Sequence, residues 1–501
     1  MIKSLWCGKA LVFICAVIFS LGGCSQKEAK EPPAGTAEIV TELFGGDKNS
    51  FGNVEAPAGF DWRQCEGVVL DFIVENNINA NILSKECEKF TDVTGIKVNV
   101  RSMDFTTLTE KINMEFISKT DQYELIYVDP YQTLTRFSDS LEDLYLYEKD
   151  DRLPHIVGGL EQFSREQLEV CAYFENEDKL CSIPFDSTNM IMFYRKDIFE
   201  KYAGQMEEDL GYRPQPGTLD FTWERYLEVS VWISEHVPKA EVKYGSLTMS
   251  AQHNSVYTEF STILAAYGGD YFENEEVAML GVESPGELSN DKESFVAALS
   301  LYKRLVELNP EETREWNWTQ INEMFQDGQV AMMANWDENA AAVENPMYSA
   351  VSGKVGYAVL PAGTARSANI YGGSGIGINR YASDEKKLAS WLFIIWATSP
   401  QIQTKILLEE GGGNMPTRKD IYRLIESRYL AVLPHASATI WAQKTAYAYY
   451  RPKMKNSYDF ESMVILNLED MIRGGTEPES VYQNLKDQWY QTEKERNSQR
   501  D

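Results

Sequence analysis

Three groups of polar residues each directly follow a short apolar segment in the first part of the chain. They are Glu75-Asn76-Asn77, Met103-Asp104-Phe105 and Asp129-Pro130-Tyr131. Carboxylates accept hydrogen bonds, amides donate and accept them, and aromatic rings cover apolar C–H surface. A cleft needs this combination in order to bind a neutral ligand that is rich in hydroxyl groups.

Two carboxylates, Asp129 and Asp186, permit a second chemistry. A pair of carboxyl groups that face a sugar is also the general acid and base of a glycosidase. Nothing in the sequence marks either group as an acid with a raised pKa. The stretch Gly372–Ile376 ends in Ile where a nucleophile elbow has Gly. Its glycines are better interpreted as positions where backbone N–H groups approach a ligand.

The sequence shows no motif for a metal ion or a cofactor. Its 4 histidines are scattered, without HExxH or another metal-binding spacing. The acidic stretch Asp270–Glu276 could bind calcium through several carboxylates, but it lacks EF-hand spacing, and a solvated hairpin is the favoured interpretation. We therefore predict no metal and no cofactor, and a structural calcium ion stays an open alternative.

The three polar groups follow segments in which strand patterns alternate with helix patterns. Val68–Val74 is β-branched and apolar, and the helical spacing after it stops at Thr94-Gly95, where Gly suits a helix C-terminus. Ile96–Val100 alternates as a second strand, Thr106–Ser118 has helical spacing, and Tyr123–Val128 is a third apolar strand. This order predicts a parallel sheet, in which ligands bind at the carboxyl ends of the strands.

Later in the chain the pattern changes. Helices predominate after Gly211, and strands are expected at Val330–Ala334, Gly356–Leu360 and Gly375–Asn379. Trp223 lies in the first turn of an amphipathic helix, so we expect it in the hydrophobic core.

Composition limits the classes of function. The chain has 501 residues, of which 43% are apolar and 25% charged, as in soluble globular proteins. Lys and Arg number 47 against 76 Asp and Glu, which gives a net charge of -29. A basic face for phosphate groups is therefore not expected, and nucleic acid is excluded as the expected partner.

The amino terminus has the features of an export signal. Lys3 and Lys9 precede the apolar run Leu11–Leu21, which is too short to span a bilayer. The run ends in Leu21-Gly22-Gly23-Cys24, which resembles the bacterial lipobox. We expect residues 1–23 to be a lipoprotein signal peptide and Cys24 to carry a lipid that anchors the chain to the extracytoplasmic face of the cell membrane. An ordinary cleavable signal is the alternative. The polar residues 24–60 are expected to form a flexible tether.

Four cysteines follow the tether: Cys65, Cys87, Cys171 and Cys181. Their even number in an exported protein permits disulfides, and Cys171 and Cys181 flank a predicted hairpin. Buried free thiols are an equal alternative, and the spacing fits no zinc site.

Seven segments carry a resemblance that covers nearly the whole exported part. They are Pro184–Phe199 (PFDSTNMIMFYRKDIF), Phe221–Tyr226 (FTWERY), Ala265–Phe272 (AAYGGDYF), Met324–Trp336 (MFQDGQVAMMANW), Val355–Gly363 (VGYAVLPAG), Gly372–Asn379 (GGSGIGIN) and Gly411–Asp420 (GGGNMPTRKD). By these segments and their order, the chain resembles the extracellular solute-binding proteins of ABC importers, in particular the carbohydrate-binding branch that includes maltodextrin-binding proteins.

The resemblance implies an α/β fold of two lobes, each a mostly parallel sheet flanked by helices and each discontinuous in sequence. The N-terminal lobe would comprise residues 61–186 plus about 335–385, and the C-terminal lobe residues 187–334 plus about 386–501. Segments near Pro184–Asn189 and Ala331–Trp336 would cross between the lobes, with the ligand clamped between them.

The resemblance also implies a function. The expected protein is a monomeric lipoprotein, not an enzyme, that captures an oligosaccharide, monosaccharide or polyol and delivers it to the permease subunits of an ABC transporter. A cell-surface carbohydrate hydrolase is the alternative. Trp336 is expected to stack against the ligand. The residues expected to bind the ligand are Asn76, Asp104, Asp129, Tyr131, Asp186, Thr188, Glu259, Trp336, Gly373, Ser374, Tyr458 and Glu461.

Overall fold

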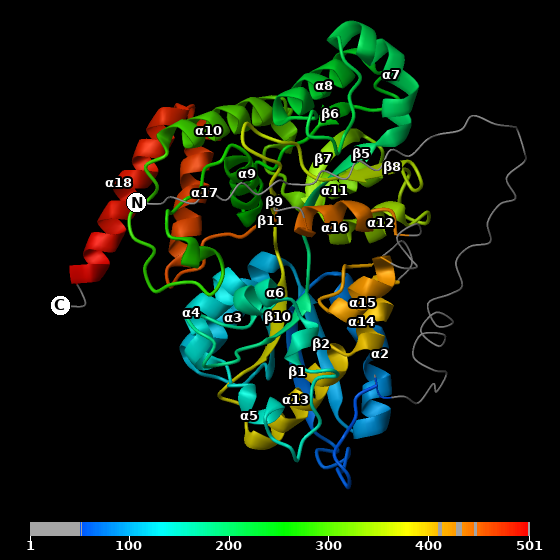
Figure 1. Ribbon diagram of the computed structural model, residues 1–501, viewed down its shortest axis with the longest axis vertical. Coiled ribbons are helices and arrows are strands. Elements are labelled where there is room, and N and C mark those ends of the chain that lie inside the picture. The colour runs from blue at the N-terminus through cyan, green and yellow to red at the C-terminus, as the bar shows by residue number, and fades with distance from the viewer. Residues whose placement is uncertain (1–50, 52, 409–412, 427–432, 445–447, 499–501) are drawn as a thin grey trace, which may run out of the picture. The chain divides into compact units, whose positions relative to one another are not determined.

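The computed structural model describes residues 51, 53–408, 413–426, 433–444 and 448–498, which are coloured in Figure 1. The predicted signal peptide, Cys24 and nearly all of the predicted tether lie outside these residues. The described residues have two large hydrophobic cores, one for each of two main sheets. The predicted α/β architecture with two sheet-based lobes is confirmed. Among the described residues, no helix combines the length and the apolar character that a membrane crossing requires.

The first sheet contains the strands predicted in the first part of the chain. Its five strands lie in the order β2 (Lys97–Met103), β1 (Val69–Glu75), β3 (Leu125–Val128), β10 (Ser374–Ile378) and β4 (Ile183–Asp186). β1 is parallel to β2 and β3, whereas β10 is antiparallel to β3 and β4. The helices that pack around this sheet are α2 (Ile78–Thr94), α3 (Phe105–Ser118), α6 (Arg165–Cys171), α13 (Asp384–Ala397), α14 (Pro400–Leu407) and α15 (Lys419–Leu424).

Local chemistry sets both ends of α2. The Asn77 side chain accepts a hydrogen bond from the Ala80 N–H at 3.0 Å and caps the first turn. Gly95 ends the helix with φ of 71°, a left-handed conformation that suits glycine. Leu83 and Phe90 are fully buried on the face between these ends. The predicted end of this helix is confirmed.

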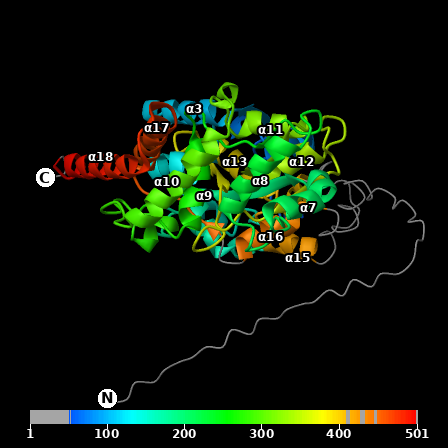
Figure 2. The same cartoon turned by 90° about the horizontal axis from the view of Figure 1, so that it is seen from above.

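The second sheet gathers strands from the middle of the chain. It has the order β6 (Tyr244–Ser246), β7 (Val330–Trp336), β5 (Met190–Arg195) and β8 (Val355–Ala358). Trp223 is buried in its core, as expected. Helices α17 and α18 lie beside α9 and α10 (Figure 2). The helices of this part are α7 (Lys196–Leu210), α8 (Trp223–His236), α9 (Asn254–Ala266), α10 (Lys292–Glu307), α11 (Trp318–Gln326), α12 (Ala340–Glu344), α16 (Ala436–Lys444), α17 (Ser457–Gly474) and α18 (Pro478–Ser498).

Short elements connect the larger ones. They are η1 (Pro130–Leu134), α4 (Thr135–Phe137), η2 (Ser138–Ser140), α5 (Tyr145–Glu148), η3 (Leu160–Gln162), η4 (Glu275–Ala278), η5 (Glu311–Thr313), η6 (Asp337–Asn339), and the paired strands β9 (Asn369–Ile370) and β11 (Ala448–Tyr449).

The second sheet differs from the expected mostly parallel arrangement. β5 is antiparallel to both β7 and β8, and only β6 and β7 are parallel. The reason is that β5 enters directly from the first sheet and therefore begins at the edge where β7 ends. β10 enters the first sheet in the same way, which explains its antiparallel pairing there.

The lobe boundaries also differ from the prediction. Ala331–Trp336, expected to cross between the lobes, belongs to β7 and pairs with β5 along its length. The chain crosses at residues 187–189 and returns at residues 371–373, between β9 and β10. Residues 355–358 therefore belong to the second sheet, and residues 386–407 pack in the first core. The pattern of a strand does not reveal its partner, because pairing is decided by residues far away in the sequence.

Two further expectations concern cysteines and the acidic stretch. The four described cysteines are buried free thiols, so no disulfide links Cys171 to Cys181. Residues 270–276 are largely solvated, as expected, since Asp270 and residues 273–276 are exposed, but they form no hairpin: no strand lies in this described stretch, and η4 begins at Glu275.

Candidate functional site

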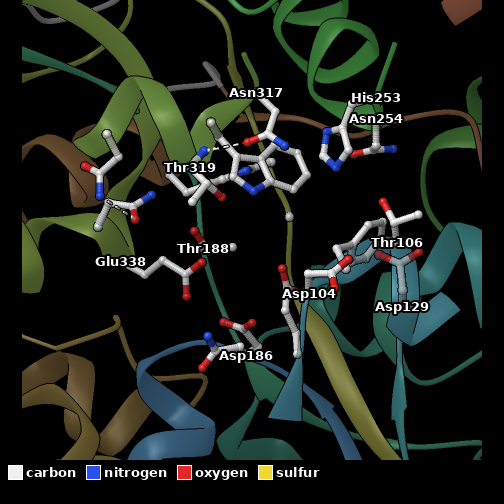
Figure 3. Close-up of a pocket in the computed structure, with 18 of the residues that line it drawn as sticks. Asp104, Thr106, Asp129, Asp186, Thr188, His253, Asn254, Asn317, Thr319 and Glu338 are labelled. Atoms are coloured by element: carbon white, nitrogen blue, oxygen red, sulfur yellow. Dashed lines mark hydrogen bonds between the residues drawn. The ribbon is translucent and has the colours of Figure 1, made fainter. Parts of the chain in front are cut away.

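A cavity of about 560 Å³ lies where strand ends from both sheets meet, and Figure 3 shows part of its lining. The first sheet contributes Glu75, Asp129 and Asp186 from the carboxyl ends of β1, β3 and β4. The second sheet contributes Trp336 from the end of β7, and Trp318 opens α11 beside it. The expectation that ligand-binding groups gather at the strand ends matches this geometry.

Two acidic residues of the lining are N-cap residues of helical elements. Asp104 accepts hydrogen bonds from the N–H and hydroxyl of Thr107, at 3.0 and 2.7 Å, at the start of α3. These bonds lower the pKa of Asp104. Asp129 accepts the N–H groups of Tyr131 and Gln132 at 2.9 and 2.7 Å and so begins η1. Burial nevertheless raises the pKa of Asp129.

Asp186 is held by donors from three separate parts of the first lobe. The Tyr127 hydroxyl donates to it at 2.6 Å, the Asn77 amide at 3.2 Å, and the Asn414 amide completes the set. The carboxylate is almost fully buried, and burial raises its pKa despite these donors. Asp186, at the end of β4, therefore joins β3 to the start of α2 and to Asn414.

Glu75 and Glu338 have far fewer protein partners. Oε2 of Glu338 is buried and has no hydrogen-bond partner among the described residues. Glu75 shares the Tyr127 hydroxyl with Asp186, to which that hydroxyl donates at 2.6 Å. Burial raises the pKa of both Glu75 and Glu338, and the negative charge of Asp186 raises it further.

Arg451 supplies positive charge on another side of the cavity. Its guanidinium lies 4.0 Å from the centre of the Tyr131 ring and faces the carboxylates of Asp129 and Glu461. Burial raises the pKa of Glu461 to about 7, although the Arg451 charge acts in the opposite direction. Glu461 also accepts a hydrogen bond from the Asn254 amide, which lines the cavity.

Aromatic rings form the wall on the side of the second sheet. The rings of Trp318 and Trp336 meet edge to face, with centroids 6.1 Å apart. The rings of His253 and Trp318 pack with their centroids 4.5 Å apart. Burial lowers the pKa of His253 to about 4, so this side chain is neutral at pH 7. A Cβ on Gly372 would lie 2.7 Å from the Trp336 ring, so glycine is required for this close approach.

Seven of the twelve predicted ligand-binding residues line the cavity. They are Asn76, Asp104, Asp129, Asp186, Thr188, Trp336 and Ser374.

The other five predicted residues do not line the cavity, and their contacts explain why. Tyr131 lies beneath Arg451, and Glu461 lies behind Asn254. Glu259 is buried in the second core and accepts the Met249 N–H at 2.8 Å. Gly373 packs against Tyr371, and Tyr458 is exposed on α17, where Arg136 covers its ring at 4.7 Å.

Other residues of the lining were missed by the sequence reasoning. The polar and aromatic run that begins α11 was a usable signal, because Asn317 and Gln320 form a capping box there. Glu75 and Phe105 stand in the groups at the predicted strand ends and Gly372 in the glycine stretch, but they were not selected as ligand-binding residues. The other side chains carry no local signal, because only the packing of distant segments brings them to the cavity. The missed residues are Glu75, Phe105, Thr106, Tyr127, His253, Asn254, Asn317, Trp318, Thr319, Gln320, Asn322, Glu323, Gln326, Glu338, Asn339, Gly372 and Arg451.

The lining can bind a polyhydroxylated molecule. Carboxylate and amide groups on one side can accept and donate hydrogen bonds, and the tryptophan rings can cover C–H faces. Within the described part of the chain, no group of three or more His, Cys, Asp or Glu side chains is arranged to hold a metal ion.

Comparison with known proteins identifies a family and similar proteins. A family model described as bacterial extracellular solute-binding protein matches residues 85–431. An erythritol/L-threitol-binding protein of Mycolicibacterium smegmatis is 22% identical over 378 residues, which cover 72% of each chain. A probable amino-acid ABC transporter periplasmic-binding protein of Sinorhizobium fredii is 20% identical over 365 residues, which cover 72% of this chain and 75% of the relative.

A solved structure shows the same fold. It is a solute-binding protein of an ABC transporter from Agrobacterium radiobacter in complex with ribitol, with a TM-score of 0.68 and 22% identity. The match covers 85% of this chain and 98% of the other.

Proposed function

The chain belongs to the family of bacterial extracellular solute-binding proteins, and from this premise we propose that it captures a carbohydrate or polyol and delivers it to the permease of an ABC transporter. The observation that carries this ligand class is the cavity between the two sheets, with carboxylates and amides on one side and Trp318 and Trp336 on the other. Two of the relatives described above bind or were solved with polyols, which supports the same class.

We propose that the seven predicted residues in the lining contact this ligand. Thr188 lies in the crossing segment 187–189, and Ser374 directly follows the crossing segment 371–373, so a ligand there would lie beside both segments. Trp336 would cover a C–H face of the ligand.

Hydrolysis, the alternative function, needs a general acid and a base that are free to act on the ligand, and the raised pKa values of Asp129 and Asp186 alone do not provide these. Asp186 already accepts hydrogen bonds from three side chains, and Asp129 accepts two from backbone N–H groups. Carboxylates held in this way act as acceptors that position the surrounding structure. We therefore propose binding and transport, without a catalytic step.

The cellular setting of the proposal rests on the sequence. We propose that residues 1–23 are a signal peptide, that Cys24 carries the lipid anchor, that residues 24–60 are a tether, and that the protein acts as a monomer. Such an anchor would hold the cavity outside the cell membrane, where a permease can receive the ligand.

The test is calorimetry of the purified protein with a panel of sugars, polyols and amino acids, with chromatography of each mixture. We expect binding of at least one sugar or polyol and its recovery unchanged. Binding of amino acids alone would overturn the ligand class, and release of hydrolysis products would overturn the proposal of a non-catalytic binder.

A further inference from the structure

The lining of the cavity contains more acidic than basic side chains. Of its described residues, six are acidic, and one, Arg451, is a lysine or arginine. A neutral polyol needs acceptors, but amides and hydroxyl groups provide these without a net charge. Whether the cavity prefers a neutral or a cationic ligand therefore depends on which carboxylates are not already held by hydrogen-bond donors of the protein.

Four of the six acidic residues are accounted for. Asp104 caps α3, Asp129 caps η1 and faces Arg451, and Asp186 is held by three side-chain donors. Glu323 lies on the exposed side of α11, where water screens its charge.

Glu75 and Glu338 are the two that remain. Glu75 ends β1 of the first sheet, and Glu338 follows β7 of the second, so one comes from each side of the cavity. Figure 3 shows the side chains of Glu338 and Asp186 directed into the same part of the cavity. Both Glu75 and Glu338 are close enough to Asp186 for its charge to raise their pKa, in addition to the effect of burial. None of the described cations is among the groups that shift these pKa values.

We propose that Glu75 and Glu338 bind a basic nitrogen of the ligand, so that the preferred substrate class is an aminated sugar or polyol. This inference rests on the proposed function and narrows it. Burial and the charge of Asp186 raise the pKa of both carboxyl groups, and a ligand cation would favour their ionised form, with which its N–H groups form charge-assisted hydrogen bonds.

The rest of the lining fits an organic cation better than a bare metal ion. The described residues contain no metal-binding group of His, Cys, Asp or Glu side chains. Trp318 and Trp336 instead offer ring faces, which cover C–H groups and also attract cations.

The experiment compares ligands that differ in the amine alone. Calorimetry at pH 7 would measure D-glucosamine against D-glucose, and N-methyl-D-glucamine against D-sorbitol, with N-acetyl-D-glucosamine as the form whose amine is neutral. We expect the amine of at least one pair to bind on the order of tenfold more tightly than its neutral parent, and acetylation to abolish that gain.

Variants then test the two carboxylates. We expect Glu75→Gln and Glu338→Gln to weaken binding of the amine more than binding of the neutral parent, and so to reduce the preference for the amine. Glu311→Gln, at an exposed acid outside the cavity, removes the same charge and should leave the preference intact. Thermal melts would show that each variant is folded.

The outcomes separate this inference from the proposed function. Equal affinity for amine and neutral parent in both pairs, or an amine preference that survives both substitutions, would overturn the inference and leave the function as a sugar or polyol binder intact. Absence of binding for every sugar, polyol and amine would overturn both.

Discussion

The ring of Trp336 lines the ligand cavity and also packs against the segment that crosses between the two sheets at Gly372. It is 7% exposed and contacts Trp318 and the backbone at Gly372. We predict that Trp336→Ala weakens ligand binding by about 1–3 kcal/mol, because a stacking surface and its apolar burial are lost. Calorimetry of the folded variant measures this effect.

A denaturant melt of the same variant separates binding from folding. A ring that served packing alone would cost about 3–5 kcal/mol of stability when it is cut to Ala. Wild-type affinity in a strongly destabilised variant would assign Trp336 to the core and remove it from the site. Trp336→Phe, which keeps an aromatic ring, is the matched control.

Glu259 gives a second prediction at the residue scale. It is 3% exposed, and burial raises its pKa from 4.5 to about 8. Between these values the folded state keeps a proton that the unfolded state releases, so this residue's contribution to stability is complete below pH 4.5 and is lost as the pH rises towards 8.

We therefore predict that Glu259→Gln reduces the loss of protein stability that accompanies the rise in pH. The free energy of unfolding of the wild type, relative to the variant, should fall between pH 5 and pH 8 by up to about 1.4 kcal/mol per pH unit. Denaturant melts at both pH values measure it. Parallel pH profiles for the two proteins would show that Glu259 is ionised in the folded state.

Among the secondary-structure elements, β6 and α8 approach each other unusually closely. A Cβ at Gly245 in β6 would lie 1.9 Å from the Ser230 carbonyl oxygen in α8. We predict that Gly245→Ala destabilises the protein by about 1–3 kcal/mol or more, because the helix must move away from the sheet. Chemical denaturation measures the change.

The control for this prediction is another glycine. Gly204 lies within α7, and no heavy atom lies within 4 Å of the place where its Cβ would be. Gly204→Ala should therefore stabilise the protein by about 0.5–1 kcal/mol. Equal effects of both substitutions would show that the close approach of β6 and α8 does not constrain the fold.

At the scale of the whole molecule, the chain crosses between the lobes at residues 187–189 and 371–373 and again between α15 and α16, and the first two segments allow a hinge. We predict that ligand binding closes the lobes about these segments, because a clamp that surrounds a small solute must first open. Small-angle scattering should give a smaller radius of gyration with saturating ligand than without it. Identical curves would contradict the hinge.

Membrane attachment is a separate property of the whole molecule. We predict that Cys24→Ser releases the protein into the medium or leaves its signal unprocessed, because the apolar run ends in Leu21-Gly22-Gly23-Cys24. Cell fractionation and metabolic labelling with a fatty acid measure this. Normal processing and unchanged membrane retention of the variant would rule out this anchor.

The sequence by itself determined the local elements of the first lobe and the residues at their ends. Asn77 and Gly95 terminate α2 through contacts within a few residues, so local pattern was sufficient to place the helix. Asn76, Asp104 and Asp129 were predicted correctly to lie at one edge, because parallel strands must end on the same side of a sheet.

Only the tertiary structure decided which strands are partners and which carboxylates remain free. β10 pairs with β3, and β8 with β5, across long stretches of chain, so a strand pattern could not assign either one to its lobe. Glu259 was predicted to bind the ligand and Glu75 was not, yet Glu75 lines the cavity and Glu259 is buried in the second core. The physical reason is that helix caps and periodicity depend on neighbours in sequence, whereas sheet pairing, burial and the assignment of donors to a carboxylate depend on residues that meet only after folding.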